Sequence, residues 1–283
     1  MKHMKKYYIL FSFILTFLLC LSGCTITDSE NTSYNGLRVS YIDVGQGDSE
    51  LIQVNGKNLL IDAGPNSSRS KFMSYLDRQD IKKLDYVIAT HPDEDHIGGM
   101  SDVIKKYDVD TFIAPKKISN TKTFENMVQA LRNKDIKITL PKPGSKLEMG
   151  DNVSAEIMAP NSSSYPDTNN YSVVLKITYG NTKFLFTGDA EKESEQEMLD
   201  RNYDISADVL KVGHHGSSSS TSQEFLNRVN PTIAIISCGK NNKYGHPTKK
   251  IVNRLKKKNI QIYRTDVDGN IILKSDGHKI VKE

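Results

Sequence analysis

Several side chains that bind divalent metals in proteins fall within six positions of the sequence. They are His91, Asp93, Asp95 and His96. Imidazole nitrogens and carboxylate oxygens are the donors that zinc, manganese and iron accept. The apolar run at residues 86–89 is typical of a buried strand, so the cluster is predicted to lie where a strand ends. The alternative is that the two aspartates only cap the next helix, but capping does not account for two flanking histidines.

Further candidate ligands recur where other predicted strands end. They are Asp62, Asp189 and the pair His214-His215. Because α/β proteins assemble sites at the carboxyl ends of strands that share one sheet edge, we expect these side chains to converge. Two cations bridged by a carboxylate, with a metal-bound hydroxide as the nucleophile, hydrolyse phosphodiesters or acyl groups. The pattern therefore indicates metal-dependent hydrolysis.

The elements expected to position these ligands alternate along the chain. Strands are predicted at residues 37–44, 51–54, 57–62, 86–89, 111–114, 136–140, 172–179, 183–187, 207–212, 232–237, 261–264 and 270–273. Helices are predicted at residues 70–80, 97–107, 123–133, 191–201, 222–229 and 248–258. Asn55-Gly56 suits the two central positions of a type I′ hairpin turn. This alternation predicts layered α/β packing in one large domain.

The N-terminal residues resemble a secretory signal of the lipoprotein type. A basic start precedes an apolar run of about 15 residues, which is too short for a comfortable membrane span. The sequence Leu-Ser-Gly-Cys that ends at Cys24 resembles a bacterial lipobox, in which cleavage precedes a lipid-carrying cysteine. We expect a signal peptide at residues 1–23, a polar tether at 24–36 and a folded domain at 37–283. The alternative is a plain signal peptide or an uncleaved anchor.

This interpretation predicts an exported protein, held by lipid on Cys24 at the extracytoplasmic face of the cell membrane. The whole chain has 38 Lys and Arg against 34 Asp and Glu, but three lysines leave with the signal and the balance falls from +4 to +1. Overall charge therefore does not indicate nucleic-acid binding, although a local basic groove can form from residues 249–250 and 256–258. Cys238 would be the one cysteine of the folded domain, which excludes an intramolecular disulfide framework.

The order of the motifs resembles a known family. The cluster at residues 91–96, with Ile-Asp-Ala-Gly at 61–64 and Thr-Gly-Asp at 187–189, looks like the metallo-β-lactamase-fold hydrolases. Five motifs are also similar to the soluble C-terminal domain of ComEC-type DNA-uptake proteins. They lie at residues 43–49, 90–99, 210–217, 244–247 and 263–266. The resemblance runs from about residue 39 to 273 and implies a four-layer αββα sandwich with hydrolase activity.

The resemblance also implies a role for each candidate ligand. His91 and Asp93 would bind one metal, and Asp95, His96 and His215 the other, with Asp189 bridging the two and Asp62 orienting the His91 loop from behind. Asp93 stands where many members of the family have histidine, and residues 169–172 supply no histidine where a further ligand is usual. More carboxylate and less imidazole favours harder ions. The expected cofactor is therefore one or two divalent ions, zinc or manganese.

Catalysis is predicted to use Asp95 together with a histidine that donates a proton to the leaving oxygen. His214 and His246 are the two candidates for that proton donor. His246 can alternatively be a solvated loop histidine. Cys238 is expected to be an ordinary core thiol.

Substrate contacts are predicted in the motifs that resemble the ComEC-type domain, outside the ligand cluster. The residues assigned to them are Asp43, Gln46, Asp48 and Ser217. Residues 45–47 can alternatively form a bare turn, and Lys211, which lies in an apolar strand, is expected to be structural rather than to bind phosphate.

Three functions are compatible with this sequence. The first is a phosphodiesterase that acts on extracellular DNA at the cell surface. The second is hydrolysis of a small phosphodiester or ester, for example a phosphocholine compound or a cyclic nucleotide. The third is a surface protein that binds nucleic acid without cutting it. The ligand cluster disfavours the third, because a binding protein has no need for so many charged ligands in one cleft. No sequence feature indicates an oligomeric state.

Overall fold

The computed structural model describes residues 36–283. The predicted signal peptide, Cys24 and the predicted tether up to residue 35 lie outside the described residues. Within the described part of the chain, no helix is both long and apolar enough to cross a membrane.

The described chain forms an eight-stranded sheet and a seven-stranded sheet. The first sheet has the spatial order β15-β14-β1-β2-β3-β4-β5-β6, with β1 Leu37–Tyr41, β2 Glu50–Val54, β3 Lys57–Ile61, β4 Lys83–Ile88, β5 Asp108–Ile113, β6 Ile138–Thr139, β14 Ile271–Ser275 and β15 Ile280–Lys282. The second sheet has the order β13-β12-β11-β10-β9-β8-β7, with β7 Lys146–Leu147, β8 Val153–Ala159, β9 Val174–Tyr179, β10 Thr182–Phe186, β11 Val209–Lys211, β12 Ile233–Ile236 and β13 Gln261–Arg264.

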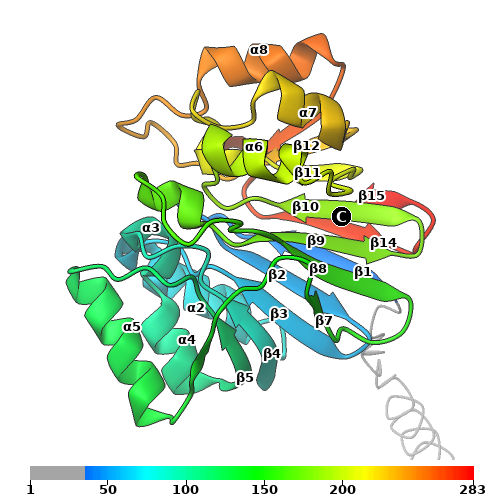
Figure 1. The fold of residues 1–283 in the computed structure, drawn as a ribbon. Coiled ribbons are helices and arrows are strands. Elements are labelled where there is room, and N and C mark those ends of the chain that lie inside the picture. The colour runs from blue at the N-terminus through cyan, green and yellow to red at the C-terminus, as the bar shows by residue number, and fades with distance from the viewer. Residues whose placement is uncertain (1–35) are drawn as a thin grey trace, which may run out of the picture. The chain divides into compact units, whose positions relative to one another are not determined.

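The helices cover the outer face of each sheet. They are α2 Arg69–Asp77, α3 Glu94–Ile97, α4 Met100–Lys106, α5 Lys122–Asn133, α6 Lys192–Asp200, α7 Gln223–Val229, α8 Lys249–Lys257 and α9 Thr265–Asp268, with short 3₁₀ turns η1 Asn66–Ser68, η2 Thr168–Tyr171 and η3 Gly213–Gly216. Helices α2, α4 and α5 lie on the side of the first sheet, and α6, α7 and α8 lie on the side of the second (Figure 1). The two sheets lie between these helical layers.

Three apolar clusters correspond to the three interfaces between layers. The middle cluster joins the facing sides of the two sheets and includes Val39, Ile52 and Phe184. One outer cluster packs the α2, α4 and α5 side chains against the first sheet, and the other packs α6, α7 and α8 against the second. Sheets that are apolar on both faces need helices outside and a partner sheet inside. The predicted four-layer αββα sandwich is confirmed.

Parallel strands in each sheet bring the predicted ligand loops to one edge. Strands β3 to β6 pair in parallel in the first sheet, and β10 to β13 pair in parallel in the second. The predicted hairpin is confirmed, because Asn55 and Gly56 join β2 to β3 with φ angles of 52° and 73°. Positive φ at both central positions defines a type I′ turn.

The predicted helix at residues 97–107 is wrong in its boundaries. The chain forms a short helix α3 that already begins at Glu94, turns at the glycine pair after Ile97, and continues as α4. A Cβ atom on Gly98 would lie 2.3 Å from the backbone nitrogen of Asn66 and 2.5 Å from the carbonyl oxygen of Gly64. The glycine therefore permits a close packing of two backbones that no other residue allows. The predicted strand at 136–140 is shortened to β6, and α9 and β15 were not predicted.

A buried carboxylate in α6 holds the loop that follows the candidate ligands His214 and His215. The side chain of Glu195 accepts hydrogen bonds from the backbone N–H groups of Thr221 and Ser222 at 2.5 and 2.9 Å, just before α7. We predict that Glu195→Ala lowers the free energy of unfolding by about 3 kcal/mol, because one buried and one partly buried backbone donor lose a charged acceptor. Urea denaturation measures this change.

The matched control for that measurement is Glu224→Ala, which removes an exposed carboxylate from the first turn of α7. It should change the free energy of unfolding by less than about 0.5 kcal/mol. Equal effects of the two substitutions would show that Glu195 does not hold this loop.

Candidate metal centre

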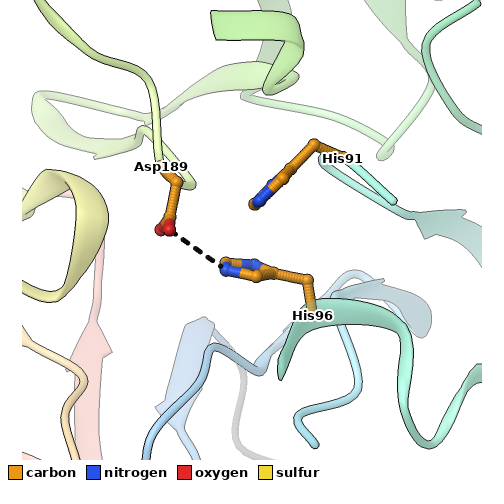
Figure 2. Close-up of side chains that lie close together, drawn as sticks. All are labelled: His91, His96 and Asp189. Carbon is orange, nitrogen blue, oxygen red and sulfur yellow. Dashed lines mark ion pairs between the residues drawn. The ribbon is translucent and has the colours of Figure 1, made fainter. Parts of the chain in front are cut away.

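The predicted ligands lie in the segments that follow the carboxyl ends of strands, and Asp95 and His96 lie in the short helix α3. Asp62 follows β3, the His91 loop follows β4, Asp189 follows β10 and His215 follows β11. Figure 2 shows His91, His96 and Asp189 pointing toward one another from separate elements. Donor atoms of these three residues lie within 4.8 Å of one another, and so do those of Asp95, His96 and His215. The structure therefore brings together side chains that are far apart in the sequence.

Asp189 occupies the centre of the cluster. Its Oδ2 atom lies 3.4 Å from Nε2 of His96, 3.5 Å from Nε2 of His215 and 3.6 Å from Nε2 of His214. The carboxylate is 3% exposed, and its backbone N–H donates to Ser172 Oγ at 3.0 Å. A carboxylate surrounded by imidazoles in this way can bridge two cations.

The two aspartates of the original motif complete the cluster. Asp95 Oδ2 lies 3.3 Å from Nε2 of His215, and Asp93 Oδ2 lies 3.7 Å from Nε2 of His91. Asp93 occupies the N-cap position of α3, but its side chain makes no capping hydrogen bond. Capping therefore does not use the Asp93 carboxylate, which leaves this side chain free to act as a ligand.

The second nitrogen of each ring is bound by the protein, which fixes the orientation of the ring. Nδ1 of His215 donates to the carbonyl oxygen of Ser237 at 2.9 Å, and because a carbonyl only accepts, the proton must be on Nδ1. Nδ1 of His96 lies 2.7 Å from Asp62 Oδ2, and Nδ1 of His91 lies 3.2 Å from Thr90 Oγ1. In each case Nε2 is the nitrogen that faces the cluster, as in metal-binding histidines whose other nitrogen is hydrogen-bonded.

Several buried polar atoms of the cluster make no hydrogen bond to any described residue. They are Nε2 of His91, His96 and His215, and Oδ1 of Asp189. Buried polar atoms without partners are rare and call for an explanation, because each one costs free energy. Divalent cations would satisfy all four, and nitrogen and carboxylate donors are a normal ligand set for zinc or manganese. The residues therefore fit the predicted metal centre.

Electrostatic coupling at the cluster is strong. Burial alone would lower the pKa of His215, but Asp189 and Asp48 outweigh it and raise this pKa to about 10. The pKa of His96 is raised in the same way, chiefly by Asp189 and Asp62. Burial would raise the pKa of Asp189, but the neighbouring imidazoles lower it well below its usual range. A cation that binds these nitrogens must displace a proton, so metal uptake is coupled to proton release.

Asp62 supports the ligand loop from beneath. It is fully buried and has a left-handed backbone conformation with φ of 55°. Its carboxylate accepts hydrogen bonds from the Thr90 N–H at 2.8 Å and the Thr90 hydroxyl at 2.6 Å, in addition to the His96 contact. Asp62 was predicted to orient the His91 loop. The structure places it against that loop, although the ring that it contacts is His96.

Asp48 lies below the cluster and not on its surface, contrary to the substrate-binding role predicted for it. It is 1% exposed, and its Oδ2 pairs with the ammonium of Lys211 at 2.5 Å while its Oδ1 lies 3.2 Å from Nδ1 of His215. Both oxygens of this carboxylate contact protein side chains, and these contacts assign it to holding His215. Lys211 is fully buried beside it, so the interpretation of Lys211 as structural agrees with its position.

A cleft opens over the cluster, and its lining residues are Gln46, Asp93, Asp95, Asn169, Asp189, His214, His215, Tyr244 and His246. Gln46 is the predicted substrate-binding residue that lines this cleft. A Cβ atom on the neighbouring Gly47 would lie 2.3 Å from the carbonyl oxygen of Asp95, so this glycine lets the loop pack directly on the ligand loop. Gln46 Oε1 accepts from the Gly239 N–H at 3.1 Å, which leaves the buried Nε2 as a donor with no described partner. Residues 45–47 therefore pack against the ligand loop and bind Gly239, which an isolated turn would not do.

The other two predicted substrate contacts do not line this cleft. Asp43 pairs with Lys71 of α2 at 2.5 Å, and the Ser217 hydroxyl lies 2.8 Å from that of Ser219. Both side chains are thus engaged with neighbouring residues.

His214 and His246 both line the cleft, and their surroundings differ. Nδ1 of His214 lies 3.0 Å from Glu191 Oε1, and although burial opposes it, this carboxylate together with Asp189 raises the pKa of His214. Burial and the neighbouring His214 lower the pKa of His246 to about 4. Glu191 was not predicted, because a carboxylate at the start of a charged helix is indistinguishable in sequence from a solvated one.

Tyr244 is a further residue of the cleft that sequence reasoning missed. It lines the cleft with His246, and the two rings stack with centroids 5.8 Å apart and an interplanar angle of 24°. Its side chain is 57% exposed. The motif Tyr-Gly-His-Pro contained the signal, but only its histidine was predicted to act in the site.

Comparison with known proteins agrees with this geometry. The chain is 36% identical over 273 residues to ComE operon protein 3 of Bacillus subtilis, covering 90% of this chain and 34% of that protein. It is 29% identical over 254 residues to Competence protein ComA of Neisseria gonorrhoeae, covering 89% of this chain and 34% of that protein. The chain thus spans about a third of the length of these relatives. The resemblance predicted from the motifs is confirmed.

A solved structure and a family profile identify the fold. The metallo-beta-lactamase fold protein YhfI from Bacillus subtilis superposes with a TM-score of 0.54 at 14% identity, covering 87% of this chain and all of that one. The profile of the Metallo-beta-lactamase superfamily matches residues 42–240, a range that contains every candidate ligand. The chain belongs to the metallo-beta-lactamase superfamily.

Proposed function

We propose that this protein is a metal-dependent phosphodiesterase that acts on DNA. The observation that carries the proposal is the convergence of Nε2 atoms from three histidines on the Asp189 carboxylate, with Asp93 and Asp95 beside them. The printed names of the relatives, a competence protein and a ComE operon protein, support DNA as the substrate.

The candidate ligands divide into two sets that share Asp189. His91 and Asp93 would hold one cation, and Asp95, His96 and His215 would hold the other. The mixture of imidazole and carboxylate donors suits zinc or manganese. When bound there, divalent cations lower the pKa of water and offset the negative charge that develops on phosphoryl oxygens.

The residues around the cluster would bind the phosphodiester and move the proton. Gln46 can donate a hydrogen bond from Nε2 to a phosphate oxygen, since its Oε1 is already bound to Gly239. We assign proton donation to His214, because the Glu191 carboxylate next to Nδ1 stabilises the protonated ring and Nε2 faces Asp189. His246 lies against both His214 and Tyr244, which suits it to position the leaving group.

We also propose that the protein is exported and attached to the cell membrane by lipid. The basic start, the apolar run and the Leu-Ser-Gly-Cys sequence support export and lipid attachment at Cys24. A lipid anchor of this kind would hold the hydrolase domain at the extracytoplasmic face of the cell membrane, where DNA outside the cell is within reach.

We predict that the purified full-length protein contains at least about one transition-metal ion per chain. Asp189→Asn should lower the metal content at least about tenfold, because this carboxylate would be shared by both cations and contacts the ligand rings of His96 and His215. Elemental analysis measures the metal content. Asp108→Asn, which changes an exposed carboxylate at the opposite end of β5, is the control and should retain the metal. Less than half an ion per chain in the unmutated protein would contradict the metal centre.

We predict that the protein nicks plasmid DNA in the presence of Mn²⁺, and that Asp95→Asn lowers the rate at least about 100-fold because a ligand is lost. Gel electrophoresis of supercoiled plasmid measures nicking, with Asp108→Asn again as the control. A small phosphodiester and a small ester are tested in parallel. Cleavage of either one with intact plasmid would assign a small-molecule substrate, and DNA binding without any hydrolysis would contradict an enzymatic role.

We predict that the mature protein is a lipoprotein. In cells that process lipoproteins, Cys24→Ser should move the protein from the membrane fraction to the soluble or secreted fraction and abolish labelling by radioactive palmitate. Cys238→Ser is the matched control, because Cys238 is buried in the folded domain. Membrane retention of the Cys24→Ser variant would indicate an uncleaved apolar anchor.

A further inference from the structure

An apolar cavity of about 220 Å³ adjoins the candidate metal centre. His91 and Pro92, at the start of the ligand loop, form one side of it. Phe124 and Met127 of α5 and the exposed side chain of Ile118 form much of the rest. The proposed phosphodiesterase mechanism makes no use of this cavity, although the candidate ligand His91 is one of its lining residues.

Exposed apolar side chains of the described residues gather at the cavity and at the metal cleft. Six large apolar side chains are exposed, and four of them lie there. Ile118, Ile138 and Leu140 line the cavity with exposed fractions of 79%, 40% and 54%, and Tyr244 lines the cleft. Apolar surface concentrated beside a polar site is typical of a surface that binds a partly apolar ligand.

A continuous row of ring contacts connects the cavity to Tyr244. In order, the centroid distances are 4.1 Å for His91–His96, 5.4 Å for His96–His215, 6.0 Å for His215–His214, 5.4 Å for His214–His246 and 5.8 Å for His246–Tyr244. The cavity is at the His91 end of this row, and the exposed tyrosine is at the other end. The candidate metal ligands therefore lie between the cavity and Tyr244 along this row.

Positive charge accompanies the apolar surface at both ends. Lys116 and Lys117 line the cavity. The ammonium of Lys243 lies 5.1 Å from the centroid of the Tyr244 ring. The Lys243 side chain is exposed, so a flat ligand group can displace it from the face of the Tyr244 ring. The displaced Lys243 ammonium is then free to pair with an anion. Each end thus offers an apolar contact together with a cation.

We propose that the cleft and the cavity bind single-stranded DNA, with one unpaired base in the apolar cavity, the backbone passing the metal centre and a further base stacked on Tyr244. This inference rests on the proposed phosphodiesterase function and specifies its substrate. Stacking on aromatic and apolar side chains accepts any base, and nearby lysines bind the backbone. Bases inside a relaxed duplex are stacked and paired, so they do not present a face to either end of the cleft, whereas supercoiling favours unpaired segments in a plasmid.

The test measures binding separately from cleavage. Fluorescence anisotropy of the full-length protein, with Ca²⁺ as the sole divalent ion, compares three labelled probes of 12 nucleotides: oligo-dT, a wholly abasic strand with the same phosphates, and a blunt duplex. We expect oligo-dT to bind at least about tenfold more tightly than the abasic strand, since each stacked base contributes about fivefold or more. The duplex should bind no better than the abasic strand.

Substitutions at exposed positions assign the two subsites without disturbing the fold. Tyr244→Ala and Ile118→Ser should each weaken oligo-dT binding about fivefold and leave the abasic strand unchanged. Tyr244→Phe should retain the affinity, because the stacking surface is kept. Val267→Ser, which changes a 73% exposed apolar side chain outside the cavity and the cleft, is the matched control.

Three results would overturn the inference. They are equal affinity for oligo-dT and the abasic strand, duplex binding as tight as oligo-dT binding, and equal loss in Val267→Ser and Tyr244→Ala. Plasmid nicking combined with any of them would leave the proposed hydrolysis standing and remove only this substrate assignment. Base-dependent binding without cleavage would support the binding surface and contradict the hydrolysis.

Discussion

The structure depends on holding one buried carboxylate, that of Asp189, within 3.6 Å of Nε2 atoms from three imidazole rings. Burying an anion is costly unless charge and hydrogen bonds compensate. The rings provide that compensation only while their Nε2 atoms face inward, and left free they would turn to form other hydrogen bonds. The rest of the site can be understood as the set of contacts that prevents this rotation.

Each ring is fixed by a different part of the fold. Asp62 at the end of β3 holds His96, the Ser237 carbonyl after β12 holds His215, and Glu191 before α6 holds His214. Parallel strands in both sheets end at the same edge, so supports from distant parts of the sequence meet there. A further layer lies beneath, where the buried pair of Asp48 and Lys211 contacts His215. Positioning therefore extends from the cluster into the interface between the sheets.

The sequence predicted the ligands because they follow short apolar strands, and that pattern is local. It did not predict what depends on tertiary contacts. Asp48 resembles a loop carboxylate in the sequence, and only the packing of Gly47 against the ligand loop shows that it is buried. The break between α3 and α4 depends in the same way on Gly98 meeting the loop after β3. Tyr244 was overlooked because exposure, which distinguishes a binding surface from a core ring, cannot be read from a motif.

The distribution of charge also bears on how the cleft can receive a polyanion. Asp93, Asp95 and Asp189 would repel a phosphate, so bound cations would have to add to the positive charge of a protonated His214 at the centre of the cleft. The lysines lie instead at its two ends, beside apolar surface. A predicted net charge of only +1 for the mature chain is then no obstacle, because attraction is local and short-ranged. Bound cations and unpaired bases would both contribute to the affinity for DNA. The same few side chains would therefore determine both DNA affinity and hydrolysis.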